Sequence, residues 1–169
     1  MDGERYQQPL TIQRDPRLPG VTDKDLREQF DLAAKIRDKL SQANEAVIRM
    51  RTLKNQLGER MKSPSAAAFK AQAETIRTQL DAVEEEIYQV RNRSPRDTLN
   101  YPIKLNNQLA VLQTYVDTGS FRPTDQEYLV FKELSGNLDA ILGRLGQVVS
   151  GELGRLNIAL EAIGLLPIR

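Results

Sequence analysis

Apolar residues that recur every three or four positions constrain the fold of this chain more than any other feature. This spacing places apolar side chains along one side of an α-helix, which must then be buried against other helices. The first stripe runs from Leu26 to Leu57 after an N-cap at Thr22, and it predicts a helix of about 40 residues, roughly 60 Å long. Its members are Leu26, Phe30, Ala33, Ile36, Leu40, Ala43, Val47, Met50, Leu53 and Leu57.

The second stripe has the most regular spacing, because its steps alternate between four and three residues as in a coiled-coil seam. Ser63 and Pro64 precede it as an N-cap and a first-turn proline. Ser94 and Pro95 are expected to end it, since the residue before a proline disfavours helix. Its members are Phe69, Ala73, Ile76, Leu80, Val83, Ile87 and Val90.

Two further stripes follow a polar connection. Pro102 is expected to open a short helix that carries Leu105, Leu109, Leu112 and Val116 and ends at Gly119. Residues 124–127 form a capping-box motif that opens the last stripe, which Gly164 and Pro167 close. The members of that stripe are Phe131, Leu134, Leu138, Ile141, Leu145, Val149, Leu153, Leu156, Leu160 and Ile163.

Short turns between amphipathic helices favour antiparallel neighbours. The sequence therefore predicts an all-α fold: an elongated antiparallel four-helix bundle over residues 21–169, with three long helices and one short one. Residues 1–20 contain prolines and Gly20, and Leu10 to Gln13 alternate weakly as in a strand. A single strand needs a partner, so this extended N-terminal arm is either the remnant of a preceding β-domain or an arm lying on the bundle.

Five glycines interrupt the last predicted helix, and each costs about 0.8–1 kcal/mol relative to alanine in a helix interior. One interpretation is a weakness that neighbouring helices tolerate. The other is that a second backbone or a docking domain approaches closely. The glycines are Gly136, Gly143, Gly146, Gly151 and Gly154.

The residue types that the chain lacks restrict its chemistry. It has no His and no Cys, which removes Ser-His-Asp and Cys-His nucleophiles, disulfides and the usual ligands of zinc and di-iron centres. A net charge of +1 gives no overall attraction to nucleic acid or anionic lipid, so we expect neither partner. No apolar run approaches the roughly 18 residues of a membrane helix, and the N-terminus has no apolar segment typical of a secretory signal.

The charged clusters predict no site. In the run Glu84-Glu85-Glu86 only Glu84 falls near the apolar seam, and the other two are expected to face water. Arg91, Arg93 and Arg96 fit a helix C-terminus followed by a solvated loop better than a phosphate site. No spacing singles out a pair of carboxylates for glycoside hydrolysis. We therefore predict no catalytic, cofactor-binding or metal-binding residues.

Several short motifs resemble the C-terminal region of bacterial BNR/Asp-box repeat proteins, which are sortilin-like β-propeller proteins often labelled glycosyl hydrolases. The likeness extends from Gln8 to about Asn157. In that family a β-sandwich strand ends in an Asp-Pro-Arg turn and leads into a helical tail. The matching segments are residues 8–17 (QPLTIQRDPR), 25–33 (DLREQFDLA), 104–110 (KLNNQLA), 123–124 (PT) and 156–157 (LN).

The resemblance implies that this chain is a non-catalytic accessory domain of a larger periplasmic or secreted protein. It would pack against the β-domains of that protein or mediate self-association, with a homodimer joined through the arm. The propeller, which would carry any substrate site, has no counterpart in these residues, and the glycines and the arginine-rich loop are not features of the family. Two alternatives stay open: a glycoside hydrolase with its acid and base on the bundle, and a free-standing helical adaptor module.

Overall fold

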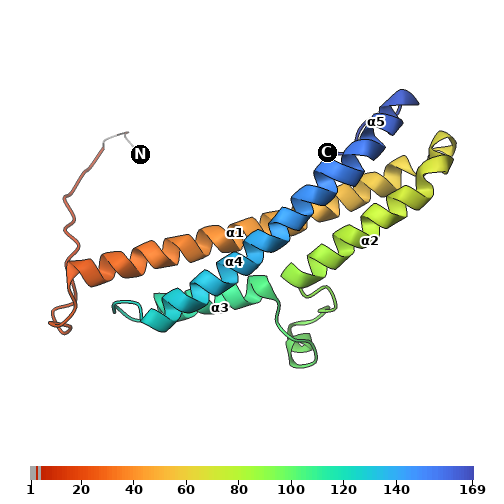
Figure 1. Cartoon of the computed structure of the whole chain (residues 1–169). Coiled ribbons are helices and arrows are strands. Elements are labelled where there is room, and N and C mark those ends of the chain that lie inside the picture. Colours follow the sequence, from red (N-terminus) through yellow and green to blue (C-terminus); the bar gives the residue numbers. More distant parts are fainter. Residues whose placement is uncertain (1–2, 4) are drawn as a thin grey trace.

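The computed structural model describes residue 3 and residues 5–169, and these form an elongated all-α bundle, as predicted (Figure 1). No strand occurs among the described residues. The short helical turns are η1 (Pro64–Phe69), η2 (Pro95–Leu99) and a π-helical turn, η3 (Val149–Leu153), which joins the last two helices. The α-helices are α1 (Asp23–Arg60), α2 (Lys70–Ile87), α3 (Leu105–Asp117), α4 (Asp125–Val148) and α5 (Gly154–Ala162).

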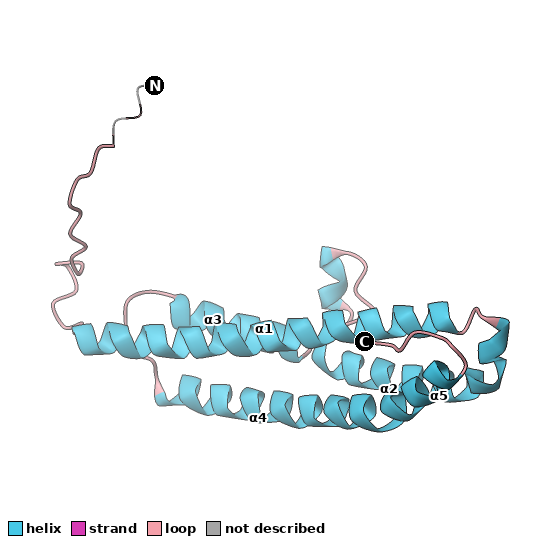
Figure 2. Ribbon diagram, turned by 90° about the horizontal axis from the view of Figure 1, so that it is seen from above, coloured by secondary structure: helices cyan, strands magenta, loops and turns pink. Residues whose placement is uncertain are grey.

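Helices α2 and α3 both run antiparallel to α1 and follow one another along it (Figure 2). The C-terminal end of α3 lies against the start of α1, where the Gln29 amide donates a 2.6 Å hydrogen bond to the carbonyl oxygen of Val116. The C-terminal part of α2 lies further along α1, where Arg51 Nε is 2.7 Å from Glu84 Oε1. The continuous rod α4–η3–α5 runs parallel to α1 and contacts both α2 and α3.

The stripes predicted three long helices and one short one. In the structure, α1 and the rod α4–η3–α5 are the two long members of the bundle, and α2 and α3 together form its third side. The side chain of Gln89 accounts for this division. It is buried just after α2, and its amide donates a 2.9 Å hydrogen bond to the carbonyl oxygen of Pro102, just before α3. The chain thus re-enters the bundle close to the point at which it left, and it continues in the same direction.

All four stripes supply the hydrophobic core, which runs the length of the bundle. Ile36 and Met50 of α1, Ile76 and Leu80 of α2, and Leu109 of α3 are fully buried. The predicted first stripe is wrong at Phe30, which is 69% exposed, because Leu32 faces the core of the bundle instead. Val90, at the end of the second stripe, is also exposed. Both threonine N-caps are confirmed as capping boxes, Thr22 with Asp25 and Thr124 with Glu127. Ser63 makes no such cap, and its hydroxyl instead contacts that of Ser65.

The expected strand at Leu10–Ile12 does not form, and the arm does not lie on the bundle. Leu10 is 86% exposed and Ile12 is 89% exposed, and residues 5–13 extend away from the helices in both views (Figures 1 and 2). A strand needs a neighbouring strand for its hydrogen bonds, and the described residues provide none. Leu10 and Ile12 are therefore in an extended segment that forms no strand.

The π-helical turn has a cause in the spacing of the last stripe. From Ile141 through Leu145 and Val149 to Leu153 every step is four residues, and each such step overshoots a full helical turn by about 40°. The extra residue in the π-turn removes this accumulated rotation, so Leu153 returns to the core and is 1% exposed. The Ser150 hydroxyl also donates a 2.8 Å hydrogen bond to the carbonyl oxygen of Gly146 at this point.

The glycines of the rod α4–η3–α5 contact no backbone of another helix within the described chain. A Cβ built on Gly136, Gly143, Gly146 or Gly151 would meet no atom within 4 Å, and one on Gly154 would lie 3.7 Å from the Val149 carbonyl oxygen. Close packing inside the bundle therefore does not explain them. Approach by a separate docking domain stays a prediction.

Deletion of Ser150 tests the origin of the π-turn. Removing one residue from this segment converts it to α-helix while Leu153 and Leu156 stay on the core side, so we expect the thermal unfolding midpoint to shift by only a few degrees. Deletion of the exposed Glu45 rotates the following half of α1 by about 100° and is expected to abolish cooperative unfolding. Circular dichroism melting measures both, and equal damage from the two deletions would contradict this account.

Core packing predicts different costs for two isoleucines on helices. Ile76→Ala, at a side chain with no exposed surface, is expected to lower the free energy of unfolding by about 2–5 kcal/mol, because it leaves a cavity. Ile158→Ala, at a side chain that is 71% exposed, is expected to change it by less than about 0.5 kcal/mol. Urea unfolding monitored by circular dichroism compares the two variants.

Candidate functional site

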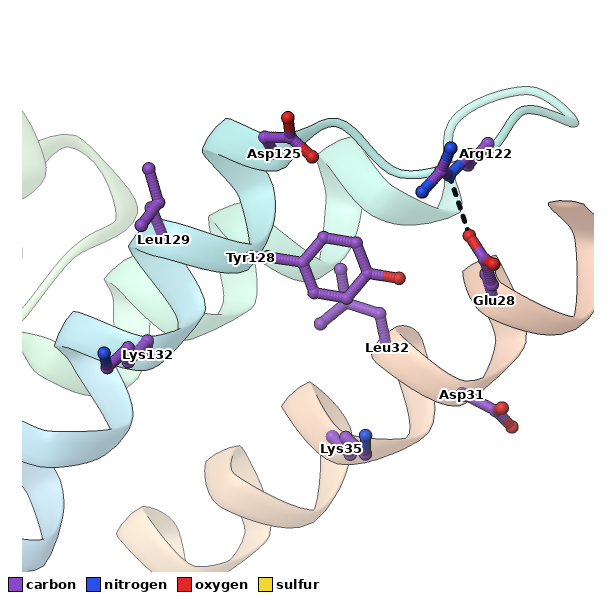
Figure 3. Close-up of a pocket in the computed structure, with 9 residues that line it drawn as sticks. All are labelled: Glu28, Asp31, Leu32, Lys35, Arg122, Asp125, Tyr128, Leu129 and Lys132. Atoms are coloured by element: carbon purple, nitrogen blue, oxygen red, sulfur yellow. Dashed lines mark hydrogen bonds and ion pairs between the residues drawn. The ribbon is translucent and has the colours of Figure 1, made fainter.

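A groove with six charged residues in its lining runs between the N-terminal halves of α1 and α4, with a volume of about 680 Å³ (Figure 3). Leu32 is buried beneath it, and Leu129 is exposed at its edge. Glu28 of α1 forms a 2.8 Å ion pair with Arg122, which stands just before α4. Acidic and basic residues balance in the lining, which consists of Glu28, Asp31, Leu32, Lys35, Arg122, Asp125, Tyr128, Leu129 and Lys132. We call this the α1/α4 groove.

Tyr128 lies in the α1/α4 groove between the two helices (Figure 3). Partial burial raises the pKa of its phenol, and the nearby carboxylate of Glu28 raises it further. The phenol therefore stays protonated at neutral pH. It has the properties of a packing group rather than of a base.

A second groove, between α3 and α4, is predominantly apolar and has a volume of about 660 Å³. Leu112 and Leu134 form its buried floor, whereas Tyr115 is 68% exposed, Val111 46% and Val130 42%. No basic residue lines it, whereas Glu127 and Glu133 do. The full lining, which we call the α3/α4 groove, is Ile103, Gln108, Val111, Leu112, Tyr115, Thr124, Gln126, Glu127, Val130, Glu133, Leu134 and Asn137.

A buried ionic cluster joins α1 to α2. Glu84 is 2% exposed, and its two carboxylate oxygens lie 2.7 Å from Arg51 Nε and 2.5 Å from Lys54 Nζ. Lys54 also contacts Asp81 at 2.5 Å, and the Arg51 guanidinium stacks 4.8 Å from the ring centre of Tyr88. The prediction that Glu84 alone of its run lies at the seam is confirmed, since Glu85 and Glu86 are exposed. The cluster fixes the register of two helices.

Two opposing effects act on the pKa of Lys54. Partial burial lowers it, but hydrogen bonds to Asp81 and Glu84 outweigh that effect, and the net pKa is raised above its usual 10.5. A raised pKa in the folded state means that the stabilising charge is fully present below the unfolded-state pKa. It is lost only as the pH rises through the folded-state value, in the alkaline range.

The arginine-rich loop is held by Asp97. The Asp97 carboxylate accepts hydrogen bonds from the backbone amides of Arg93 and Ser94, and these lower its pKa. Arg91, Arg93 and Arg96 are all exposed. Arg91 stacks 5.8 Å from the ring centre of Tyr101, a contact that the sequence analysis did not foresee.

Within the described ranges, no group of three or more acidic, histidine or cysteine side chains could hold a metal ion. Within the same ranges no helix is long and apolar enough to cross a membrane.

Hydrogen bonds from Arg17 and Thr22 lower the pKa of Asp15 and Asp25, respectively. A general acid in glycoside hydrolysis needs a shift in the opposite direction.

Comparisons with protein-family models, curated proteins and solved structures found no match. The resemblance to the tail of BNR/Asp-box proteins therefore stays a prediction.

The α3/α4 groove was not predicted from the sequence, although a signal was present. Val111 and Tyr115 lie four residues apart on the predicted third helix but outside its apolar stripe. Together they form an apolar surface to one side of that stripe.

The buried cluster predicts unequal effects of two neighbouring carboxylates. Glu84→Gln removes the charge that neutralises Arg51 and Lys54, so we expect it to lower the free energy of unfolding by about 1–3 kcal/mol. The matched variant Glu85→Gln, on the exposed face, is expected to change it by less than about 0.5 kcal/mol. Urea unfolding at neutral pH measures both, and equal effects would show that the cluster adds no net stability.

Proposed function

We propose that this chain is a non-catalytic helical interaction domain that associates through its α3/α4 groove. The observation that carries this proposal is the exposure of Val111, Tyr115 and Val130 on two adjacent helices. Contiguous apolar surface on a soluble protein marks sites of association, because its removal from water is favourable. The polar rim of Glu127 and Glu133 around an apolar centre is also typical of protein interfaces.

The partner we favour is a second copy of the chain, in a homodimer. The resemblance described above supports a wider context, in which the domain belongs to a larger periplasmic or secreted β-propeller protein. In that context the β-domains of the same protein are a further partner, and any glycoside-hydrolase activity belongs to the propeller. This wider context rests on the short sequence motifs alone.

Self-association of the purified chain tests the proposal. We expect sedimentation equilibrium to show a reversible dimer with a dissociation constant between about 1 µM and 1 mM. The double variant Tyr115→Glu/Val130→Glu, which places charges in the groove, is expected to be monomeric with unchanged helicity. Ile158→Glu, at an exposed site on α5, is the matched control and is expected to dimerise normally. A groove variant that dimerises like the unmodified chain would refute the proposal.

The non-catalytic assignment has its own test. We expect the purified chain to hydrolyse no member of a panel of fluorogenic glycosides above the buffer rate. Hydrolysis that co-purifies with the chain through two orthogonal columns would contradict the assignment. It would favour the alternative of a glycoside hydrolase with its acid and base on the bundle.

A further inference from the structure

We infer that the α3/α4 groove binds the N-terminal arm, residues 5–13, of a second copy of this chain, so that two copies exchange arms. This inference rests on the proposed function, because it names the segment that occupies the proposed association surface. It follows from four properties of the described residues: the side chains of the arm, the direction in which it leaves the body, its length and its charge.

The large apolar side chains of the arm share one side. Successive residues of an extended chain point to opposite sides, so Leu10 and Ile12 share one face with Tyr6 and Gln8, while Pro9, Thr11 and Gln13 lie on the other. Leu10 and Ile12 are almost fully exposed. Pro9 lacks an amide hydrogen and disfavours regular pairing in a sheet. The arm is therefore suited to bind by inserting side chains into a groove rather than by completing a sheet.

The root of the arm directs it away from its own body. Arg14 Nε forms a 2.9 Å ion pair with Asp23 at the start of α1, and its guanidinium also donates a hydrogen bond to the carbonyl oxygen of Val21. Consecutive turns between these residues are closed by backbone hydrogen bonds from Leu18 to Asp15 and from Val21 to Leu18, each 3.1 Å long. From this clamp the arm projects away from the helices in both views (Figures 1 and 2). A groove on a second molecule is thus the accessible one.

The arm is long enough to cross the groove, and its charge is opposite to that of the groove. Residues 5–13 span roughly 30 Å when extended, and α3, which forms one wall of the groove, is about 20 Å long. The arm segment carries Arg5 and no acidic residue, whereas Glu127 and Glu133 line the groove. Mutual exchange gives a closed two-fold dimer, so each arm contact counts twice toward the roughly 1,200 Å² that a specific interface buries.

The α1/α4 groove is the less suitable site for the arm. The Glu28–Arg122 ion pair lies in it, and acidic and basic residues balance in its lining. An arm with one positive charge and apolar side chains would displace water from charged groups there without pairing them, which is unfavourable. The α3/α4 groove has only two charged lining residues, Glu127 and Glu133, and both are opposite in sign to Arg5, so this cost is smaller there.

Two double variants of the arm test which face binds. Leu10→Asp/Ile12→Asp places two charges on the apolar face and is expected to weaken dimerisation at least about tenfold in sedimentation equilibrium. Thr11→Asp/Gln13→Asp adds the same charge on the opposite face and is expected to change the dissociation constant by less than about threefold. Equal weakening by both variants would indicate a general charge effect and overturn the inference.

Disulfide trapping tests whether the arm binds in trans. The natural chain has no cysteine, so single replacements give an unambiguous readout. Molecules carrying Ile12→Cys, mixed with molecules carrying Val130→Cys, are expected to form a heterodimeric disulfide under mild oxidation. Thr11→Cys with Val130→Cys is expected to form much less. A chain that carries both Ile12→Cys and Val130→Cys and closes mainly within itself at high dilution would show that the arm binds its own groove, and would overturn the exchange.

The two proposals fail in different ways. If Leu10→Asp/Ile12→Asp still dimerises normally while Tyr115→Glu/Val130→Glu is monomeric, the arm is not the occupant, and the groove pairs directly with another surface of the second copy. The inference then falls and the proposed function stands. If Tyr115→Glu/Val130→Glu dimerises normally, both fall. If each variant is monomeric alone but a mixture of the two forms heterodimers, both are supported, because one intact arm meets one intact groove.

Discussion

Burial of the apolar stripe of α1 is the interaction on which the rest of the structure depends. An isolated helix of this kind is marginally stable in water, so α1 is ordered by what covers it. The cover changes along its length, from α3 near Gln29 to α2 near Arg51, while the rod α4–η3–α5 accompanies it throughout. The elongated shape follows directly, because a long stripe needs an equally long set of neighbours.

Polar contacts within this apolar framework set register rather than provide chemistry. Glu84 with Arg51 and Lys54 aligns α2 on α1, and the buried amide of Gln89 aligns the end of α2 with the start of α3. A buried ion pair contributes little net stability, but it penalises any slipped arrangement that separates its charges. On the outward surface of α3 and α4, at the α3/α4 groove, apolar side chains are instead exposed to water.

Much of the fold is predictable from the sequence because it depends on local signals. Thr22 and Thr124 cap helices through residues three positions away, and the stripes specify which face each helix buries. The end-to-end arrangement of α2 and α3 was not predictable, because it depends on the long-range contact between Gln89 and Pro102. The four-residue steps around Val149 are a sequence signal for the π-turn. Val111 and Tyr115, which lie outside the apolar stripe, are a sequence signal for the α3/α4 groove. Leu10 and Ile12 in the arm are almost fully exposed, so the sequence predicted the extension of the arm but not its position.

The division of the third side between two helices has a mechanical consequence. Each of α2 and α3 covers only one half of α1 and of the rod α4–η3–α5, and the two make few contacts with each other. One of them can therefore detach while the other stays packed on its half. The molecule is then expected to behave as two cooperative folding units that share a common pair of rods, with local opening of one half costing less than complete unfolding. Local opening of the half covered by η1 and α2 would leave the end that bears the arm, covered by α3, in its native form.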